Sequence, residues 1–491
     1  MHVDIFETTA PMKRILFFSI IVTLTMVSNQ LVGQPRANYP VLHSMNRAPS
    51  SFLDHFFLPG EDNKTEVNFV FKINYDKLNF RRDRSQANGV LTENFVSEIE
   101  LIFDLYDKDI PLIPDRAFIA RESWSTIVNT SSYEDTQSDE MFIEGVVKIE
   151  IEPDDYRLIT TLLVNGQEVP LTTLASSSAS MGMNSRRPNR RETREAAIQR
   201  GTISVPDFSN SNAGSIVLLD SKRADGSYNL MNLGNNVKYA QDFSILTISH
   251  SEAKNDSLVI KMIEIGPTLA NDNNYERDVL TANLSENGTP VQSFEIKSDS
   301  NRISLSPGDD TLSYKASMVN VPNRKYKNSW YRLELLSFTG GTKTTLAQKN
   351  ILTRWFDIPT SLLNLDVALD NLKFIADEST IKELKRGNTF EKEAKFRTFW
   401  KEKDPTPDTD YNELMSEYYK RIDDAYIQFT TPTKPGYESD QGKIFIVYGP
   451  PENVDRRFPP NGVTQEIWQY GSRTFIFNAT SGFGDFELVT Q

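Results

Sequence analysis

Hydrophobic and polar residues alternate along two stretches in the first quarter of the chain. Between 67 and 75 the apolar residues share one side of an extended chain: Val67, Phe69, Phe71 and Ile73. The stretch 95–105 repeats this pattern, with acidic residues facing the other way. Because successive side chains of a strand point to opposite faces, a period of two predicts strands that bury one face.

Further short strands are predicted at 147–151 and 156–164, before the turn residues Asn165 and Gly166. Turn signals between short strands, without a helical period, favour an antiparallel, Ig-like β-sandwich over residues 64–173. Strand patterns resume between 202 and 356. We therefore expect a second β-sandwich domain over 202–356, built like the first.

The segment between the two predicted sandwiches is rich in serine and carries six arginines between 176 and 200. Polar stretches without periodicity are typical of exposed linkers, so residues 174–201 are interpreted as a linker. The alternative is a basic segment that docks to an acidic partner or to lipid headgroups.

At about residue 358 the period becomes helical. An apolar stripe predicts a long helix, and it consists of Tyr411, Leu414, Met415, Tyr418, Tyr419, Ile422, Ala425, Tyr426 and Phe429. Asp408 or Thr409 can supply the N-cap oxygen. Shorter helices are expected at 362–376 and 389–402, and strands at 443–448, 466–470, 473–478 and 484–490. These elements predict an α+β domain over 358–491, with helices packed on a β-meander.

The N-terminal residues have the pattern of a secretory signal peptide. Lys13 and Arg14 precede an apolar run over 15–27, which is too short to span a bilayer. Cleavage is expected near Gly33, so the signal peptide covers 1–33, with translation starting at Met1 or Met12. Residues 34–63 are expected to form an N-terminal extension.

The amino-acid composition excludes several classes of function. The net charge of −14 over 491 residues opposes binding to nucleic acid. The chain has no cysteine, which removes disulfides, thiolate catalysis, cysteine-bound zinc and a lipid anchor on cysteine. It has only four histidines: His2, His43, His55 and His250. We therefore expect no catalytic residues of the nucleophile–histidine type, no metal site and no cofactor.

Carboxylates near the predicted long helix are the main candidates for chemistry: Asp404, Asp408, Asp410, Glu413, Glu438 and Asp440. A pair of them at suitable separation would serve glycoside hydrolysis. The structural alternative is favoured, since Asp408 and Asp410 suit a helix start and Asp440 suits a turn. Residues 271–274 with Glu276 and Asp278 offer oxygen ligands for calcium, although a polar loop is the simpler interpretation.

Aromatic residues of the C-terminal region offer a second kind of site. Trp468 and Tyr470 point to one face of their predicted strand, and with Tyr437 they would form a platform for a sugar or peptide. Packing against the 411–429 helix is the alternative. Gly449, Pro450 and Pro451 are interpreted as a rigid strand exit.

The segment Gly436-Tyr437-Glu438-Ser439-Asp440 resembles the motif of the GWxTD-domain family of bacterial envelope proteins. Three further segments fall at the family's usual positions: Asp404-Pro405-Thr406-Pro407, Asn412-Glu413 and Tyr418-Tyr419-Lys420-Arg421-Ile422. Tyr437 stands where the family has Trp, Ser439 where it has Thr, and Gln441 where Arg is usual. The resemblance covers about 358–491 and implies a cell-envelope compartment without implying a reaction.

We interpret the chain as an exported, non-catalytic structural or adaptor protein, periplasmic or outer-membrane-associated, with an unidentified envelope protein as partner. No transmembrane segment is expected after signal cleavage, which leaves peripheral association with the outer membrane. The alternative is a carbohydrate-binding or glycoside-active protein that uses the C-terminal carboxylates and aromatics. The motif residues are expected to be structural: Gly436, Tyr437, Ser439, Asp440, Gly442, Gly449, Pro450, Pro451, Trp468 and Tyr470.

Overall fold

The computed structural model describes residues 38–46, 49, 51–87, 90–110, 117–138, 140–169, 199–210, 212–250, 257–266, 276–287, 289–291, 293–297, 302–306, 314–460, 462–480 and 484–490. The predicted signal peptide and nearly all of the predicted linker lie outside these residues.

The first two sheets are antiparallel. One has three strands in the order β1 (Ser51–Pro59), β2 (Thr65–Asn74) and β6 (Phe142–Ile151). The other contains β3 (Arg81–Ala87), β4 (Val90–Asp107), β5 (Phe118–Thr130), β7 (Asp155–Val164), β8 (Gln167–Val169) and β9 (Gln199–Ser204). Two short 3-10 turns, η1 (Tyr75–Lys77) and η2 (Asp135–Gln137), lie between these strands in the sequence.

Two of these strands lie outside the bounds predicted for the first sandwich, 64–173. β1 lies within the expected N-terminal extension, and it pairs with β2 along its whole length, from Ser51 opposite Ile73 to Pro59 opposite Thr65. β9 begins inside the expected linker and pairs with β7. β1 is a strand because apolar side chains on both of its faces, such as Leu53 and Phe56, enter separate cores.

The next two sheets contain the strands of the second predicted sandwich. The larger has the order β16 (Thr289–Val291), β19 (Tyr314–Val321), β13 (Phe243–His250), β10 (Gly214–Lys222), β11 (Tyr228–Leu230), β18 (Arg302–Ser306) and β17 (Ser293–Lys297). The smaller has the order β12 (Asn236–Lys238), β21 (Thr342–Arg354), β20 (Trp330–Thr339), β14 (Ser257–Gly266) and β15 (Arg277–Asn283). A helical turn, α5 (Leu284–Asn287), and a 3-10 turn, η3 (Asn323–Lys325), connect strands.

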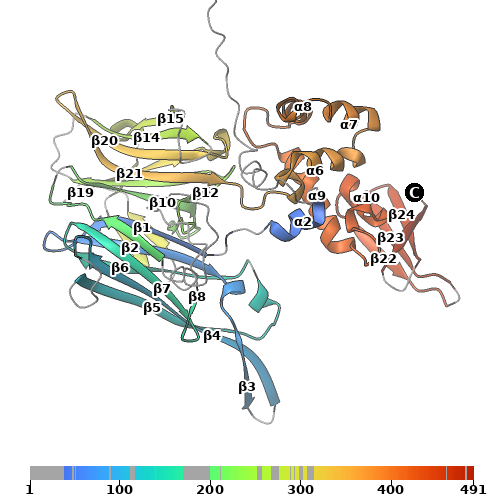
Figure 1. Ribbon diagram of the computed structural model, residues 1–491, viewed down its shortest axis with the longest axis horizontal. Helices are drawn as coiled ribbons and strands as arrows, with labels where there is room; N and C mark the ends of the chain where they lie inside the picture. Colours follow the sequence, from blue (N-terminus) through green and yellow to red (C-terminus); the bar gives the residue numbers. More distant parts are fainter. Residues whose placement is uncertain are drawn as a thin grey trace, which may run out of the picture.

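The four sheets form one stack of layers (Figure 1). The three-stranded sheet lies inside this stack, because Phe69 of β2 packs toward β4 while its neighbour Val70 packs toward the larger sheet of the second sandwich. The molecule is mainly β with antiparallel sheets, as predicted. One hydrophobic cluster packs the three-stranded sheet on β4 and β7, and another packs the larger of the next two sheets on the smaller, so the sheets form two sandwiches. A third cluster joins the second face of the three-stranded sheet to β10 and β13, so the two sandwiches contact each other.

The C-terminal region combines helices with a four-stranded antiparallel meander. The helices are α6 (Leu365–Asp370), α7 (Glu378–Leu384), α8 (Thr389–Lys401), α9 (Glu413–Phe429) and α10 (Asp440–Tyr448), with 3-10 turns η4 (Thr360–Leu363), η5 (Asn371–Phe374) and η6 (Gly436–Glu438). The strands are β22 (Asn453–Arg457), β23 (Gln465–Tyr470), β24 (Arg473–Ala479) and β25 (Phe486–Thr490).

The long predicted helix is present as α9, and its buried stripe includes Tyr419 and Ile422. Its N-cap is Asn412, whose side chain accepts a hydrogen bond from the Met415 amide, and not Asp408 or Thr409. Asn412 is the better cap because it directly precedes the first helical residue.

One predicted strand is wrong. Residues 443–448 belong to the helix α10, which begins where the Ser439 hydroxyl accepts a hydrogen bond from the Gly442 amide at 2.9 Å. The helix ends at Gly449, whose φ of 82° suits glycine. A short apolar run has no period of its own, so it fits a strand or a buried helix equally.

A short helix near the N-terminus, α2 (Tyr39–Met45), packs on the C-terminal domain and not on the sheets that follow it in the sequence. Figure 1 shows it beside α9 and below α6. Among the described residues, no helix is both long enough and apolar enough to cross a membrane.

Candidate functional site

The motif begins with a turn that only glycine permits. A Cβ at Gly436 would overlap the carbonyl oxygen of Ala425 in α9, and a Cβ at Gly442 would overlap the carbonyl oxygen of Gly436 itself. The Gly436 amide donates to the Thr430 hydroxyl at 2.9 Å. The turn η6 is therefore held in backbone contact between α9 and α10, which needs two residues without side chains.

Tyr437 is buried beneath the N-terminal helix. Its ring centroid lies 4.9 Å from that of Tyr39 in an edge-to-face contact and 6.1 Å from that of Tyr426 in a stacked one. Burial, with smaller effects from Glu438 and Tyr426, raises the pKa of Tyr437 to about 12. Tyr437 therefore fills the core between α2 and α9 and does not form a platform with Trp468.

Asp423 of α9 fixes the same helix by hydrogen bonds. The Tyr39 hydroxyl donates to its Oδ1, and the Thr360 amide donates to its Oδ2 at 2.9 Å. The His43 ring lies 3.2 Å from the Thr360 hydroxyl. Burial raises the pKa of the Asp423 carboxyl, against the opposing effect of its hydrogen-bond donors. Sequence reasoning missed Asp423, although an acid on the apolar side of an amphipathic helix was a signal that it has a partner.

Asp440 lies in the first turn of α10 and not in a loop. Its Oδ2 accepts a hydrogen bond from the Leu488 amide of β25 at 3.1 Å, and its Oδ1 pairs with Lys443 at 2.9 Å. Partial burial opposes ionisation, but Lys443 and the Leu488 amide hold the pKa of Asp440 below its ordinary value. Asp440 was expected to suit a turn, but the backbone N–H that its carboxylate accepts comes from a distant strand.

Gln441, at the usual arginine position of the motif, belongs to a buried polar cluster. Its Nε2 donates to Glu466 Oε1 at 3.1 Å, and Trp468 Nε1 donates to the same oxygen at 2.7 Å. Arg456 of β22 donates to Glu466 Oε2 at 2.9 Å. Arg456 thus supplies the positive charge that Gln441 lacks.

Trp468 is 2% exposed, and its ring lies 5.5 Å from that of Phe429 at the end of α9. The Tyr470 hydroxyl donates to the carbonyl oxygen of Gly449 at 2.7 Å. Gly449, Pro450 and Pro451 therefore follow a helix and not a strand. Pro450 is exposed and Pro451 half-buried.

The candidate carboxylates are divided between two places. Asp404 accepts from the Thr406 amide at 2.9 Å, and Asp410 accepts from the Tyr239 hydroxyl at 2.9 Å. Both line a cavity of about 330 Å³ beside Trp400. Glu438, by contrast, pairs with Lys373 at 3.2 Å on the motif side of the domain. Folding thus separates acids that are close in sequence.

The residues considered as calcium ligands pair with basic side chains wherever the structure describes them. Glu276 accepts two hydrogen bonds from Arg332 at 2.9 and 3.0 Å, and Asp278 pairs with Lys261 at 2.6 Å. Residues 271–274 lie outside the described residues. Within the described part of the chain, no group of three or more His, Asp or Glu side chains is placed to hold a metal ion.

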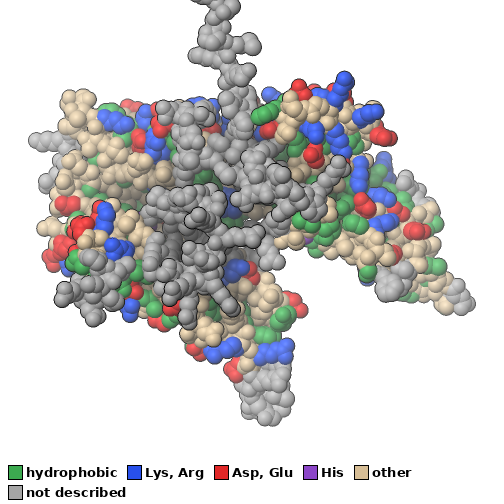
Figure 2. Space-filling view, viewed as in Figure 1, with side chains coloured by type: hydrophobic (Ala, Val, Ile, Leu, Met, Phe, Trp, Pro, Cys, Tyr) green, Lys and Arg blue, Asp and Glu red, His purple; other side chains and the backbone are tan. Residues whose placement is uncertain are grey.

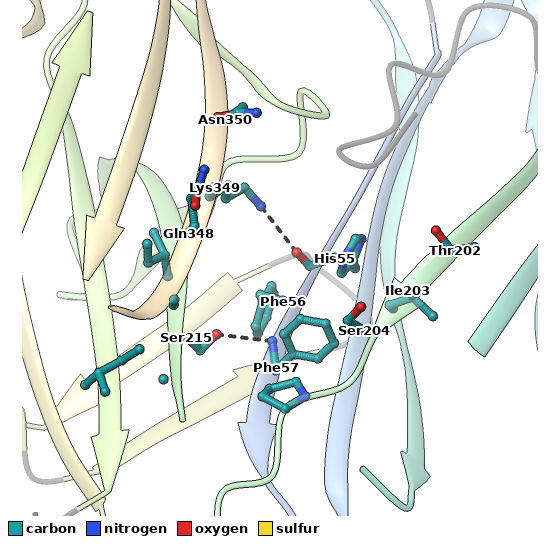
Figure 3. Close-up of a pocket in the computed structure, with 15 residues that line it drawn as sticks. His55, Phe56, Phe57, Thr202, Ile203, Ser204, Ser215, Gln348, Lys349 and Asn350 are labelled. Carbon is teal, nitrogen blue, oxygen red and sulfur yellow. Dashed lines mark hydrogen bonds between the residues drawn. The ribbon is translucent and has the colours of Figure 1, made fainter. Parts of the chain in front are cut away.

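A cavity of about 420 Å³ between the two sandwiches was not predicted from the sequence (Figure 3). Lys349 of β21 reaches across it to Asp54 of β1, with Nζ 2.8 and 2.7 Å from the two carboxylate oxygens. His55 lies next to this ion pair. Burial and the Lys349 charge lower the pKa of His55 to about 3, so the ring is neutral. A charged residue inside the apolar run 52–58 was the available signal.

Residues 357–487 match the family model of the GWxTD domain, which confirms the predicted resemblance. No curated protein matches the chain.

Two solved structures are similar over much of their length. The C-terminal domain of the Streptococcus pyogenes antigen I/II-family protein AspA has 9% identity, with 63% of this chain and all of that chain covered and a TM-score of 0.14. The N-terminal domain of a Streptococcus gordonii adhesin has 9% identity, with 63% of this chain and 90% of that chain covered and a TM-score of 0.14. At this TM-score neither likeness carries an argument about fold or function.

Proposed function

On the premise that residues 357–487 form a GWxTD domain, we propose that the chain is an exported, non-catalytic structural and adaptor protein of the bacterial cell envelope. The observation that carries this proposal is the direction of the motif side chains. Tyr437 packs under α2, Asp440 binds β25, and Trp468 packs against α9. Because these side chains contact other parts of the same chain, they support an architectural role for the motif.

The N-terminal helix adds to this argument. α2 spans only seven residues, too few for an isolated helix to be stable in water, so its contacts with the C-terminal domain hold it. Tyr39 supplies both a ring contact to Tyr437 and a hydrogen bond to Asp423. The GWxTD domain therefore binds the segment that follows the predicted export signal. Such a contact is expected if this domain holds the N-terminal segment in place while the β-sheets remain available to a partner.

The surface best suited to a partner is the outer edge of β5. Among the described strands, β5 pairs only with β4, from Phe95 opposite Thr130 to Tyr106 opposite Phe118. Its other edge pairs with none of the described strands, and Ile127 is 61% exposed. Exposed edge strands bind extended segments of other proteins by strand addition. Figure 2 shows acidic and basic side chains interspersed over the visible face, which gives no single-sign patch for a polyanion or polycation there.

Affinity capture from the native envelope tests this proposal. We expect one specific protein to bind the wild type and to be lost with Ile127→Lys, because a charge on an edge strand opposes pairing. Val489→Lys is the matched control, since Val489 is 56% exposed on the C-terminal domain. A partner retained by Ile127→Lys and lost by Val489→Lys would contradict the assignment to β5.

A glycan-hydrolysis screen separates this proposal from the carbohydrate-active alternative. Our proposal predicts no hydrolysis by the wild type. An activity that Asp404→Asn abolishes at an unchanged melting temperature would favour the enzyme, because Asn keeps the shape of the side chain and cannot transfer a proton. N-terminal sequencing of the native protein tests export, with the mature chain expected to begin near Gln34.

A further inference from the structure

A third cavity, of about 520 Å³, lies where both β-sandwiches meet the C-terminal domain. Phe52 and Lys72 line it from the first sandwich, Lys238 and Arg354 from the second, and Tyr411 from the segment before α9. This volume is in the range of pockets that hold small organic molecules, roughly 300–1,000 Å³. The cavity is separate from the motif residues and from the β5 edge.

Two cations lie side by side in its wall. β12 and β21 run parallel, and their register places Lys238 opposite Arg354. Residues in register on neighbouring strands share a face, and both of these residues line the cavity. Like charges in this arrangement oppose folding. Lys72 of β2 brings a third positive charge to the same cavity.

The surrounding carboxylates leave this charge partly uncompensated. Lys238 pairs with Asp220 at 3.4 Å, and Lys72 lies opposite Glu144 in the β2–β6 register. Arg354 makes no ion pair within the described part of the chain, and the one carboxylate among the described lining residues, Asp357, is exposed.

Burial also acts on the pKa values of these cations. It lowers the pKa of Arg354, and it lowers that of Lys72 despite the opposing charge of Glu144. The charge of Lys238 also lowers the pKa of Lys72, as expected for like charges that share one cavity.

Aromatic residues also line the cavity: Phe52, Tyr239, Trp355, Phe356 and Tyr411. The Arg354 guanidinium lies 5.6 Å from the centre of the Phe356 ring. Trp355 and Tyr411 make an edge-to-face contact with centroids 5.5 Å apart. Apolar ring faces beside a cationic group match a molecule that has both a ring and an anionic oxygen group.

We propose that this cavity binds a small organic anion, namely a ring that bears a phosphate or carboxylate group. Arg354 is the anchor, because a planar guanidinium binds either group through two parallel hydrogen bonds. Lys238 and Lys72 supply further charge, and the aromatic rings take the ring of the ligand. The bound anion removes the repulsion between Lys238 and Arg354. This site is additional to the proposed adaptor function and does not depend on it.

Isothermal titration calorimetry on the full chain tests the site with glucose 6-phosphate, glucuronate and neutral glucose. We expect saturable binding of at least one of the two anions and none of glucose. Arg354→Gln should weaken that binding at least about tenfold, since a bidentate charged contact is lost. Binding of glucose 6-phosphate alone assigns a phosphate group, and binding of glucuronate alone assigns a carboxylate.

Lys343→Gln is the matched control, because Lys343 carries the same charge on the same strand but does not line the cavity. It should change the affinity less than about twofold. Lys238→Gln is the second variant and keeps the test open if Arg354→Gln fails to fold. The proposal is overturned if neither anion binds at about 10 mM, or if binding survives unchanged in Lys238→Gln and in every folded Arg354 variant.

Discussion

The two cavities at the sheet junctions differ in how their charges are matched. Between the sandwiches, Lys349 is 10% exposed and faces Asp54, which is 6% exposed, at 2.7 Å. At the junction with the C-terminal domain, Arg354 has no carboxylate partner among the described residues and lies beside Lys238. The first arrangement satisfies a charge that folding buries, whereas the second keeps a positive charge available.

We therefore assign a structural role to the buried Asp54–Lys349 pair and a ligand-binding role to Lys238 and Arg354. A matched buried pair is expensive to break, because either partner alone would be an uncompensated charge. Two neighbouring cations without a carboxylate partner destabilise the free protein. An anion that binds between them offsets this repulsion and stabilises the folded state.

The largest effect is expected for Asp54→Ala. It leaves Lys349 buried without its partner and should lower the free energy of unfolding by about 3–5 kcal/mol. Urea denaturation measures this change. Asp278→Ala is the control, because the Lys261–Asp278 pair is 27% and 51% exposed and should contribute less than about 1 kcal/mol. Equal effects of the two substitutions would mean that the buried Asp54–Lys349 pair contributes no more to stability than an exposed pair.

The next effect is a pH dependence at His55. Its folded pKa of about 3 is below the ordinary value of about 6.5, so the unfolded chain binds more protons between these pH values. The stabilisation is complete above about pH 6.5 and is lost as the pH falls toward 3. We expect wild type to lose roughly 2 kcal/mol more than His55→Gln between pH 7 and pH 4. Parallel losses in both proteins would show that His55 does not carry the dependence.

A smaller effect of opposite sign is expected at the other cavity. Without added anion, Arg354→Gln should raise the free energy of unfolding by about 0.5 kcal/mol, because it removes the repulsion with Lys238. Lys343→Gln, which loses a contact to Glu334 at 3.6 Å, should be neutral or slightly destabilising. Thermal melts in a buffer without phosphate compare the two. Destabilisation by Arg354→Gln would indicate that the contact of the guanidinium with the Phe356 ring outweighs the repulsion by Lys238.

The smallest effect concerns ionic strength. Raising sodium chloride from about 0.05 to 0.5 M screens partly exposed charges, so wild type should gain a few tenths of a kcal/mol relative to Arg354→Gln. The cost of Asp54→Ala should change little with salt, since that pair is buried. Melting curves of the three proteins at both salt concentrations provide the measurement. If only Asp54→Ala showed a salt dependence, the unbalanced charge would lie at the Asp54–Lys349 pair and not at Lys238 and Arg354.

Much of the fold could be predicted where a single period extends over many residues. The stripe from Tyr411 to Phe429 predicted α9, and the alternation at 67–75 predicted β2. The family motif was recognised because Gly436 and Asp440 keep the family's residues. Prediction failed where the local pattern was short, as at 443–448, which forms α10.

The candidate sites were harder to predict than the fold. Tyr437 and Trp468 were considered as one platform, yet the first packs with α2 and the second with β24 and α9. Asp54 and Lys349 are 295 residues apart, and Lys72 and Arg354 come from different sandwiches. No spacing in the sequence relates such residues.

The sequence by itself determined the period of each long element, the resemblance of the C-terminal region to the GWxTD family, the scarcity of histidine and the absence of cysteine. Tertiary structure alone decided that β1 is buried on both faces, that α2 closes over Tyr437, and that Lys238 lies beside Arg354. The physical reason is that periodicity reports which face of an element is apolar. It does not report which distant element covers that face, or which charges that packing brings together.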